Sequence, residues 1–266
     1  MRRFALTIAI MTGFLVSASL TGGESRDDWN THDRKAVEAY RAGDLDTART
    51  AWLAVIEPED PQERSAPPRA ERARILYDLG NVAFRKGSTL EAVGWYTASL
   101  RLRPRDADAW ANLEHARSEA KLEPADRGDL SATLTRVLSS FTRAESEWLV
   151  ILGALLWAGV LAMEAVRGGR LWRRLAWLGA VCVLLSLSPW MYNQRFAERD
   201  TLISIEPKEQ PLQVRSEPRA DAAVIADVAP GEILERKDAL PEWTKVELDS
   251  GLEGWVKKSS VFALSR

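Results

Sequence analysis

Two long uncharged segments in the middle of the chain constrain its architecture most strongly. Residues 148–163 carry no charge, with the apolar pattern continuing to Val166, and residues 175–192 are also uncharged. At about 1.5 Å per residue, a helix over 148–166 is roughly 28 Å long, close to the thickness of a bilayer core. The sequence therefore predicts transmembrane helices at 147–166 and 175–192. Two helices buried in a soluble core are the alternative.

The short connection between these segments predicts their orientation. It contains four arginines: Arg167, Arg170, Arg173 and Arg174. Loops rich in arginine and lysine stay in the cytoplasm. We therefore expect the loop 167–174 to be cytoplasmic and both flanking regions to lie on the other side of the membrane.

The N-terminus has the features of an export signal. Arg2 and Arg3 precede an apolar stretch that reaches Leu20, and small residues follow, which is the order found in secretory signal peptides. We expect residues 1–22 to be a signal peptide; an uncleaved signal anchor is the alternative and gives the same topology. The protein is thus predicted to be a multi-pass bacterial inner-membrane protein with its soluble domains in the periplasm.

Apolar residues at three- and four-residue spacing predict helices between residues 29 and 122. One stretch matches the 34-residue tetratricopeptide repeat (TPR); its matching residues are Leu76, Leu79, Gly80, Ala83, Ala92, Tyr96, Ser99 and Pro104. A looser unit aligns Gly43 with Gly87, with a proline-rich insertion from Glu57 to Pro68 between them. We therefore expect two and a half repeats.

Repeats of this kind stack into a superhelix whose concave face takes a peptide or a partner protein. By position, the residues expected on that face are Tyr40, Arg74, Tyr77, Asn81, Arg85 and Asn112. Asn81 and Asn112 match the asparagines of TPR domains that clamp a C-terminal carboxylate, but Tyr77 stands where that clamp requires lysine. We expect a general protein-docking face, with the clamp as the alternative.

A further helix is expected at the membrane, over residues 126–145. Its apolar stripe consists of Leu130, Leu134, Val137, Leu138 and Phe141, and Thr142 with Glu145 forms a capping box that leads into the first membrane helix. We expect this helix to lie under the last repeat; a position on the membrane surface is the alternative.

After Arg199 the pattern changes to short strands separated by Pro, Gly and Asp. Strands are predicted at 224–228, 233–236, 243–248 and 254–256. The sequence LQVRSEP from Leu212 resembles the opening of bacterial SH3 (SH3b) domains, and the resemblance implies an SH3-like β-barrel at 203–266. Two tryptophans of this region, Trp243 and Trp255, either line a ligand groove or fill the core.

The composition leaves little room for catalysis or metal chemistry. The chain has 36 Lys and Arg against 38 Asp and Glu, so its charge does not indicate a nucleic-acid partner. Its one cysteine, Cys182, and its two histidines, His32 and His115, argue against a disulfide framework and a metal cluster. Phosphate-binding glycine loops and hydrolase motifs are missing from the sequence. We expect a protein that is not an enzyme and needs no cofactor.

The predicted fold class is multidomain: all-α TPR helical repeats, a transmembrane α-hairpin and a C-terminal all-β SH3-like barrel. The order of signal, TPR, two membrane helices and SH3b resembles the BatE-like proteins of the Bacteroides aerotolerance operon. The resemblance implies a non-catalytic scaffold that acts beside von Willebrand factor A-type membrane proteins, a BatD-like protein and a MoxR-type AAA+ ATPase. Because SH3b domains also bind peptidoglycan, a cell-wall tether or sensor is the alternative function.

Overall fold

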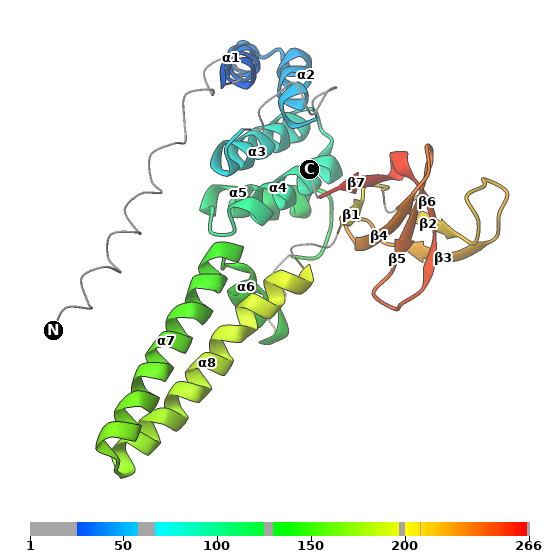
Figure 1. Ribbon diagram of the computed structural model, residues 1–266. Helices are drawn as coiled ribbons and strands as arrows, with labels where there is room; N and C mark the ends of the chain where they lie inside the picture. Colours follow the sequence, from blue (N-terminus) through cyan, green and yellow to red (C-terminus); the bar gives the residue numbers. More distant parts are fainter. Residues whose placement is uncertain (1–25, 58–66, 125–129, 197–199, 208, 265–266) are drawn as a thin grey trace, which may run out of the picture. The chain divides into compact units, whose positions relative to one another are not determined.

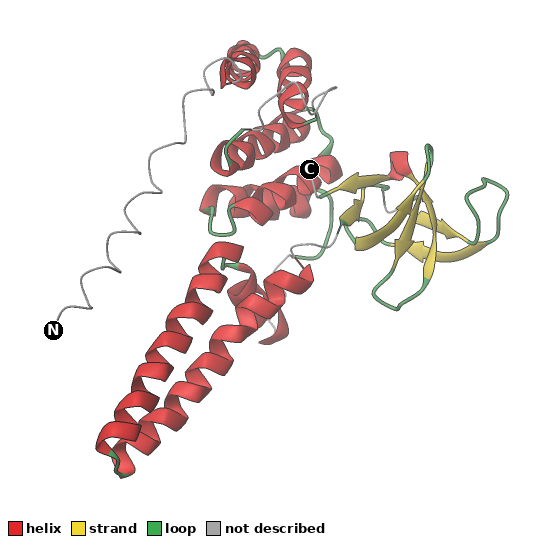
Figure 2. Cartoon of the chain, in the orientation of Figure 1, coloured by secondary structure: helices red, strands yellow, loops and turns green. Residues whose placement is uncertain are grey.

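The computed structural model describes residues 26–57, 67–124, 130–196, 200–207 and 209–264 (Figure 1). The signal peptide expected at 1–22 and most of the proline-rich insertion lie outside these residues. Helices occupy the first part of the described chain and strands the last (Figure 2). The chain divides into two compact units, residues 1–67 and 68–266.

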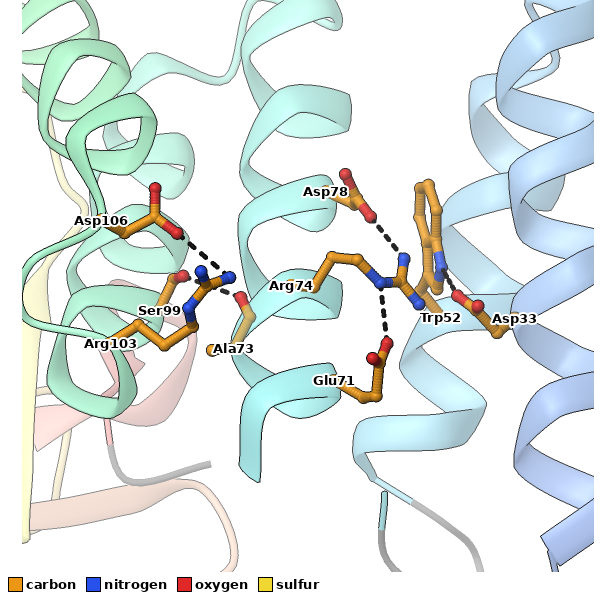
Figure 3. A network of polar contacts seen from close by, with 9 residues as sticks. All are labelled: Asp33, Trp52, Glu71, Ala73, Arg74, Asp78, Ser99, Arg103 and Asp106. Atoms are coloured by element: carbon orange, nitrogen blue, oxygen red, sulfur yellow. Dashed lines mark hydrogen bonds and ion pairs between the residues drawn. The ribbon is translucent and has the colours of Figure 1, made fainter. Parts of the chain in front are cut away.

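The first unit contains a pair of helices, α1 (Arg26–Ala42) and α2 (Leu45–Ile56). Gly43 joins them at a φ of 82°, a conformation that glycine adopts without strain. The Asp44 side chain accepts a hydrogen bond from the Thr47 amide at 3.1 Å and so caps α2. The buried Trp52 indole donates to Asp33 Oδ1 at 2.8 Å and ties α2 to α1 (Figure 3).

The second unit begins with a similar pair, α3 (Arg69–Arg85) and α4 (Thr89–Leu102), followed by α5 (Ala107–Glu119). A Cβ at Gly80 would lie 2.5 Å from the Tyr96 ring, so the two helices approach this closely because residue 80 is glycine. The buried Ser99 hydroxyl donates to the Ala73 carbonyl at 2.7 Å and bridges the same helices (Figure 3). The α4 helix also packs against α5.

A shorter helix, α6 (Leu130–Ser139), precedes the two longest ones. It packs against α8, the second of those, whereas the sequence suggested a position under the last repeat. It also ends before residue 143, so the helix expected over 126–145 is divided. Thr142 and Glu145 form the predicted capping box: the Glu145 amide donates to Thr142 Oγ1 at 3.3 Å, and the Thr142 amide donates to Glu145 Oε2 at 2.9 Å.

The longest helices, α7 (Arg143–Arg167) and α8 (Arg170–Phe196), form an antiparallel hairpin. Both are long and apolar enough to cross a membrane. Only Gly168 and Gly169 connect them, at φ values of 62° and 103°. Arg170 and the arginines after it therefore belong to the first turns of α8, where the sequence predicted a connecting loop.

Proline at position 189 lies inside α8 and cannot donate a hydrogen bond to the carbonyl of Leu185. The Ser188 hydroxyl donates to that carbonyl instead, at 2.7 Å. Because this hydroxyl takes the place of the missing amide, the Leu185 carbonyl keeps a hydrogen-bond partner within an apolar helix.

The C-terminal part is one curved antiparallel sheet with the strand order β3-β2-β6-β5-β4-β1-β7. Its strands are β1 (Thr201–Ser204), β2 (Leu212–Arg215), β3 (Val224–Val228), β4 (Ile233–Ala239), β5 (Trp243–Glu247), β6 (Glu253–Lys257) and β7 (Val261–Ala263). Seven buried aliphatic side chains form its core: Leu202, Leu212, Val214, Val228, Leu234, Val246 and Val256. The alternation of buried and exposed residues in β2 and β6 explains how such short strands enclose this core.

The sheet also contacts α4 within the second unit. The rings of Trp95 and Phe262 meet edge to face, with their centroids 4.6 Å apart at an angle of 78°. Beside them, Arg101 donates to the Thr201 hydroxyl. Burial lowers the pKa of the Arg101 guanidinium, and the charge of Asp200 opposes this shift.

Candidate binding surfaces

Four polar side chains from three helices form a hydrogen-bonded cluster in the helical region. Asn112 of α5 donates through Nδ2 to the Tyr77 hydroxyl and to Asn81 Oδ1, both of α3, at 3.0 Å each. Tyr96 of α4 donates its hydroxyl to the same Asn81 oxygen at 2.9 Å. The Tyr77 and Tyr96 rings lie 5.8 Å apart. We call these four residues the tyrosine–asparagine cluster.

The tyrosine–asparagine cluster retains hydrogen-bonding capacity. Both Nδ2 hydrogens of Asn112 and the side-chain oxygen of Asn81 are occupied, whereas no bond within the described chain uses Asn81 Nδ2 or Asn112 Oδ1. The Tyr77 hydroxyl accepts a bond and still has its own proton to donate. Tyr77, Asn81 and Asn112 are each half-buried. An extended peptide backbone carries alternating N–H and C=O groups. It can therefore pair with donors and acceptors that lie side by side and are partly exposed.

The structure thus brings together three of the six residues expected on the docking face. Arg74 lies between two carboxylates, Glu71 and Asp78, at 2.9 Å from each (Figure 3). Arg85 is exposed at the last position of α3. Tyr40 lies in α1, in the first unit, with its ring 5.9 Å from that of Trp52.

Sequence reasoning missed the polar role of Tyr96. The repeat pattern includes Tyr96, and its ring is buried against Gly80. Its hydroxyl in addition holds Asn81 in place. The repeat pattern identifies the ring's position but not the partner of its hydroxyl, because that partner lies 15 residues earlier in another helix.

A second candidate surface is an open groove of about 500 Å³ on the sheet. Its lining residues are Glu206, Glu209, Gln210, Pro211, Leu212, Gln213, Arg215, Trp243, Lys257 and Ser260. Trp243 lines it with a side chain that is 9% exposed, so this residue belongs to both groove and packed interior. Trp255 is not among the lining residues; it is half-buried on β6, where it pairs with Arg215.

The groove carries charges of both signs. Glu206 and Glu209 provide negative charge and Lys257 positive charge, and none of the three makes an ion pair within the described chain. The Arg215 guanidinium is held by the Ala222 carbonyl at 2.8 Å and by Gln213 Oε1 at 2.6 Å. A ligand with both acidic and basic groups fits such a lining better than an apolar one.

Comparison with known families identifies the strand region. Residues 211–262 match the bacterial SH3 domain. The match begins just before β2 and ends within β7, so the SH3b domain holds most of the groove's lining residues and most of the buried core. No curated protein and no solved structure matches the chain. In the described ranges, no three His, Cys, Asp or Glu residues are grouped to hold a metal ion.

Proposed function

We propose that this protein is a non-catalytic adaptor of the bacterial inner membrane that binds other proteins through two periplasmic modules. The observation that carries the proposal is the presence of two separate binding surfaces, the tyrosine–asparagine cluster and the groove of the SH3b domain. SH3b domains serve as protein-interaction or peptidoglycan-binding modules. An adaptor needs such surfaces and no reactive centre between them.

The helical region is proposed to be a short TPR array. The two helix pairs support this because their turns match: Gly43 and Gly87 have φ values of 82° and 81°. Each glycine is followed by an N-cap residue, Asp44 or Ser88, and then by a helix. The close packing of Gly80 on Tyr96 is also what the repeat pattern requires.

The hairpin α7–α8 is proposed to anchor the protein, with the Gly168–Gly169 turn in the cytoplasm. The four arginines around this turn support that orientation. The contact of Trp95 with Phe262 also supports it, since this contact requires the helical region and the SH3b domain to lie on one side of the membrane. With a signal peptide at the N-terminus, that side is the periplasm.

The tyrosine–asparagine cluster is proposed to dock an extended segment of a partner protein. Amide side chains pair with the alternating N–H and C=O groups of a peptide backbone, and the two tyrosine rings give the segment an apolar surface to lie on. Following the resemblance to BatE-like proteins, we propose as partners the von Willebrand factor A-type membrane proteins, a BatD-like protein and a MoxR-type AAA+ ATPase of an envelope-stress complex.

The test is capture of partners from native membranes in mild detergent, read by mass spectrometry. We expect the tagged protein to recover von Willebrand factor A-type proteins, and the double variant Asn81→Ala/Asn112→Ala to lose most of them. Asp108→Ala, an exposed change on α5, is the matched control and should retain them. Equal recovery by both variants would mean that the cluster is not the docking surface.

A cell-wall tether is the second candidate function, favoured by the groove around Trp243. Its acidic and basic groups suit the charged stem peptides of peptidoglycan, and the Trp243 side chain adds an aromatic contact to the lining. The full-length protein in detergent should then sediment with purified sacculi. Lys257→Ala should weaken sedimentation more than Lys258→Ala, since both lysines are exposed and only Lys257 lines the groove. Failure of the wild type to sediment would exclude this function.

A further inference from the structure

The short helix α6 carries apolar side chains that the described part of the chain leaves exposed. Leu134 and Val137 keep 56% and 50% of their surface accessible. They belong to the apolar stripe that runs through positions 130, 134, 137, 138 and 141. The residues between these positions are serines, threonines, one alanine and one arginine, Arg136. The helix is therefore amphipathic and carries a single charge.

The position of α6 in the fold is narrowly restricted. It packs against α8, and only residues 140–142 separate its end from the start of α7. Since ten helical residues span about 15 Å, all of α6 stays near the open end of the hairpin, away from the glycine turn. Figure 1 shows α6 beside that end of α8.

The bend between α6 and α7 is held by specific contacts. The capping box of Thr142 and Glu145 fixes the first turn of α7. Arg105, from the connection between α4 and α5, pairs with Glu145 at 3.1 Å and lies over the Phe141 ring at 5.6 Å. These contacts restrain the direction in which α6 leaves α7.

Large apolar side chains are exposed at the same end of the hairpin. Trp148, in the second turn of α7, is 63% exposed, and Met191, near the end of α8, is 53% exposed. Leu134 and Val137 of α6, which packs on α8, are thus exposed at the same end of the hairpin as these two residues. Strongly amphipathic helices lie in the plane of a membrane, with the apolar face about 5–10 Å into the headgroup region.

We propose that α6 is an interfacial helix whose Leu134 and Val137 side chains enter the lipid of the bilayer that α7 and α8 cross. This inference rests on the proposed membrane hairpin. The ligand of this surface is phospholipid, contacted at the boundary between headgroups and acyl chains. The leaflet concerned is the one on the same side of the membrane as the helical region. Lipid is favoured over a partner protein because α6 packs on α8 and exposes its apolar side chains at the same end of the hairpin as Trp148 and Met191. The helix would thereby set the height of the helical region above the membrane.

The test uses single cysteines that carry an environment-sensitive fluorophore, in full-length protein reconstituted into phosphatidylcholine–phosphatidylglycerol nanodiscs. With Cys182→Ser as background, the labelled positions are Leu134→Cys, Val137→Cys and, as control, Ser139→Cys, which lies on the opposite side of α6. Lipids with a quencher near the headgroup should quench positions 134 and 137 at least about twofold more than position 139. None of the three positions is fully buried, so a label there does not disturb a packed core.

The wild-type protein, labelled at its native Cys182, is a separate control, since this residue is exposed on α8 within the second apolar segment. Its label should be quenched by lipids that carry the quencher deep in the acyl chains. If Cys182 is quenched but positions 134 and 137 are not, α6 is covered by water or protein, and the inference fails while the hairpin stands. If Cys182 is not quenched, the proposed membrane hairpin fails and the inference fails with it.

Discussion

Trp157 of α7 occupies the space that a side chain at Gly179 of α8 would need. A Cβ at position 179 would lie 2.8 Å from Trp157 Cδ1. The indole also donates through Nε1 to the Ala176 carbonyl at 2.9 Å. Small residues let helices approach closely, and such packing drives association where lipid gives helices no hydrophobic reason to associate.

Replacing Gly179 should therefore weaken the hairpin. We expect Gly179→Val to displace Trp157 and lower the resistance of the hairpin to denaturation by sodium dodecyl sulfate, with a cost of about 1–3 kcal/mol for overpacking. Gly159→Val on α7 is the matched control, since a Cβ there meets nothing within 4 Å. Equal effects of the two changes would show that helix propensity, not packing on Trp157, determines the result.

Two buried serines should respond to alanine in opposite ways. The Ser99 hydroxyl donates to Ala73 at 2.7 Å, so Ser99→Ala should destabilise the protein by about 1 kcal/mol in denaturant titration. The Ser204 hydroxyl is buried without a hydrogen-bond partner in the described chain. Ser204→Ala removes this unsatisfied group and should be neutral or stabilising. A loss of stability in Ser204→Ala comparable to that of Ser99→Ala would contradict this account.

The contact between Trp95 and Phe262 should link the stability of α4 to that of the SH3b domain. Phe262 is 3% exposed, and Phe262→Ala should cost about 3–5 kcal/mol by leaving a cavity. Hydrogen exchange should then accelerate in α4 as well as in β7. Val224→Ala, at a position 44% exposed, should leave hydrogen exchange in α4 and in β7 unchanged. Faster exchange confined to the strands would mean that the two elements are energetically independent.

Local patterns predicted most of the strands well. The expected strand 224–228 coincides with β3, and that at 243–248 differs from β5 by one residue. Alternating apolar residues between Pro, Gly and Asp define such strands within a few positions. The strand β1 was missed because Thr201–Ser204 is only four residues long and is stabilised by pairing with β4 and β7, far away in the sequence.

The hairpin turn is shorter than the sequence predicted, because a positively charged segment marks a membrane border but does not by itself end a helix. The arginines after Gly169 mark the expected membrane border, but arginine is also a good helix former, so α8 begins at Arg170. Likewise, spacing placed Tyr77, Asn81 and Asn112 on one face. It did not predict their bonds to one another or to Tyr96, because these depend on how three helices pack.

The stability of the SH3b domain should depend on pH through the pair Lys245 and Glu253. Their Nζ and Oε2 atoms are 2.5 Å apart, and this hydrogen bond lowers the pKa of Glu253 below its ordinary value of 4.5. A carboxyl whose pKa is lowered by folding stabilises the folded state above its unfolded pKa, and this contribution disappears as the pH falls through the folded pKa. Protection of residues 243–257 from hydrogen exchange, corrected for intrinsic rates, should therefore decrease as the pH falls below about 4.5. In Lys245→Gln that decrease should be smaller, whereas Lys258→Gln, an exposed change after β6, should behave as the wild type. If Lys245→Gln retains the full pH dependence, the hydrogen bond to Lys245 is not its source.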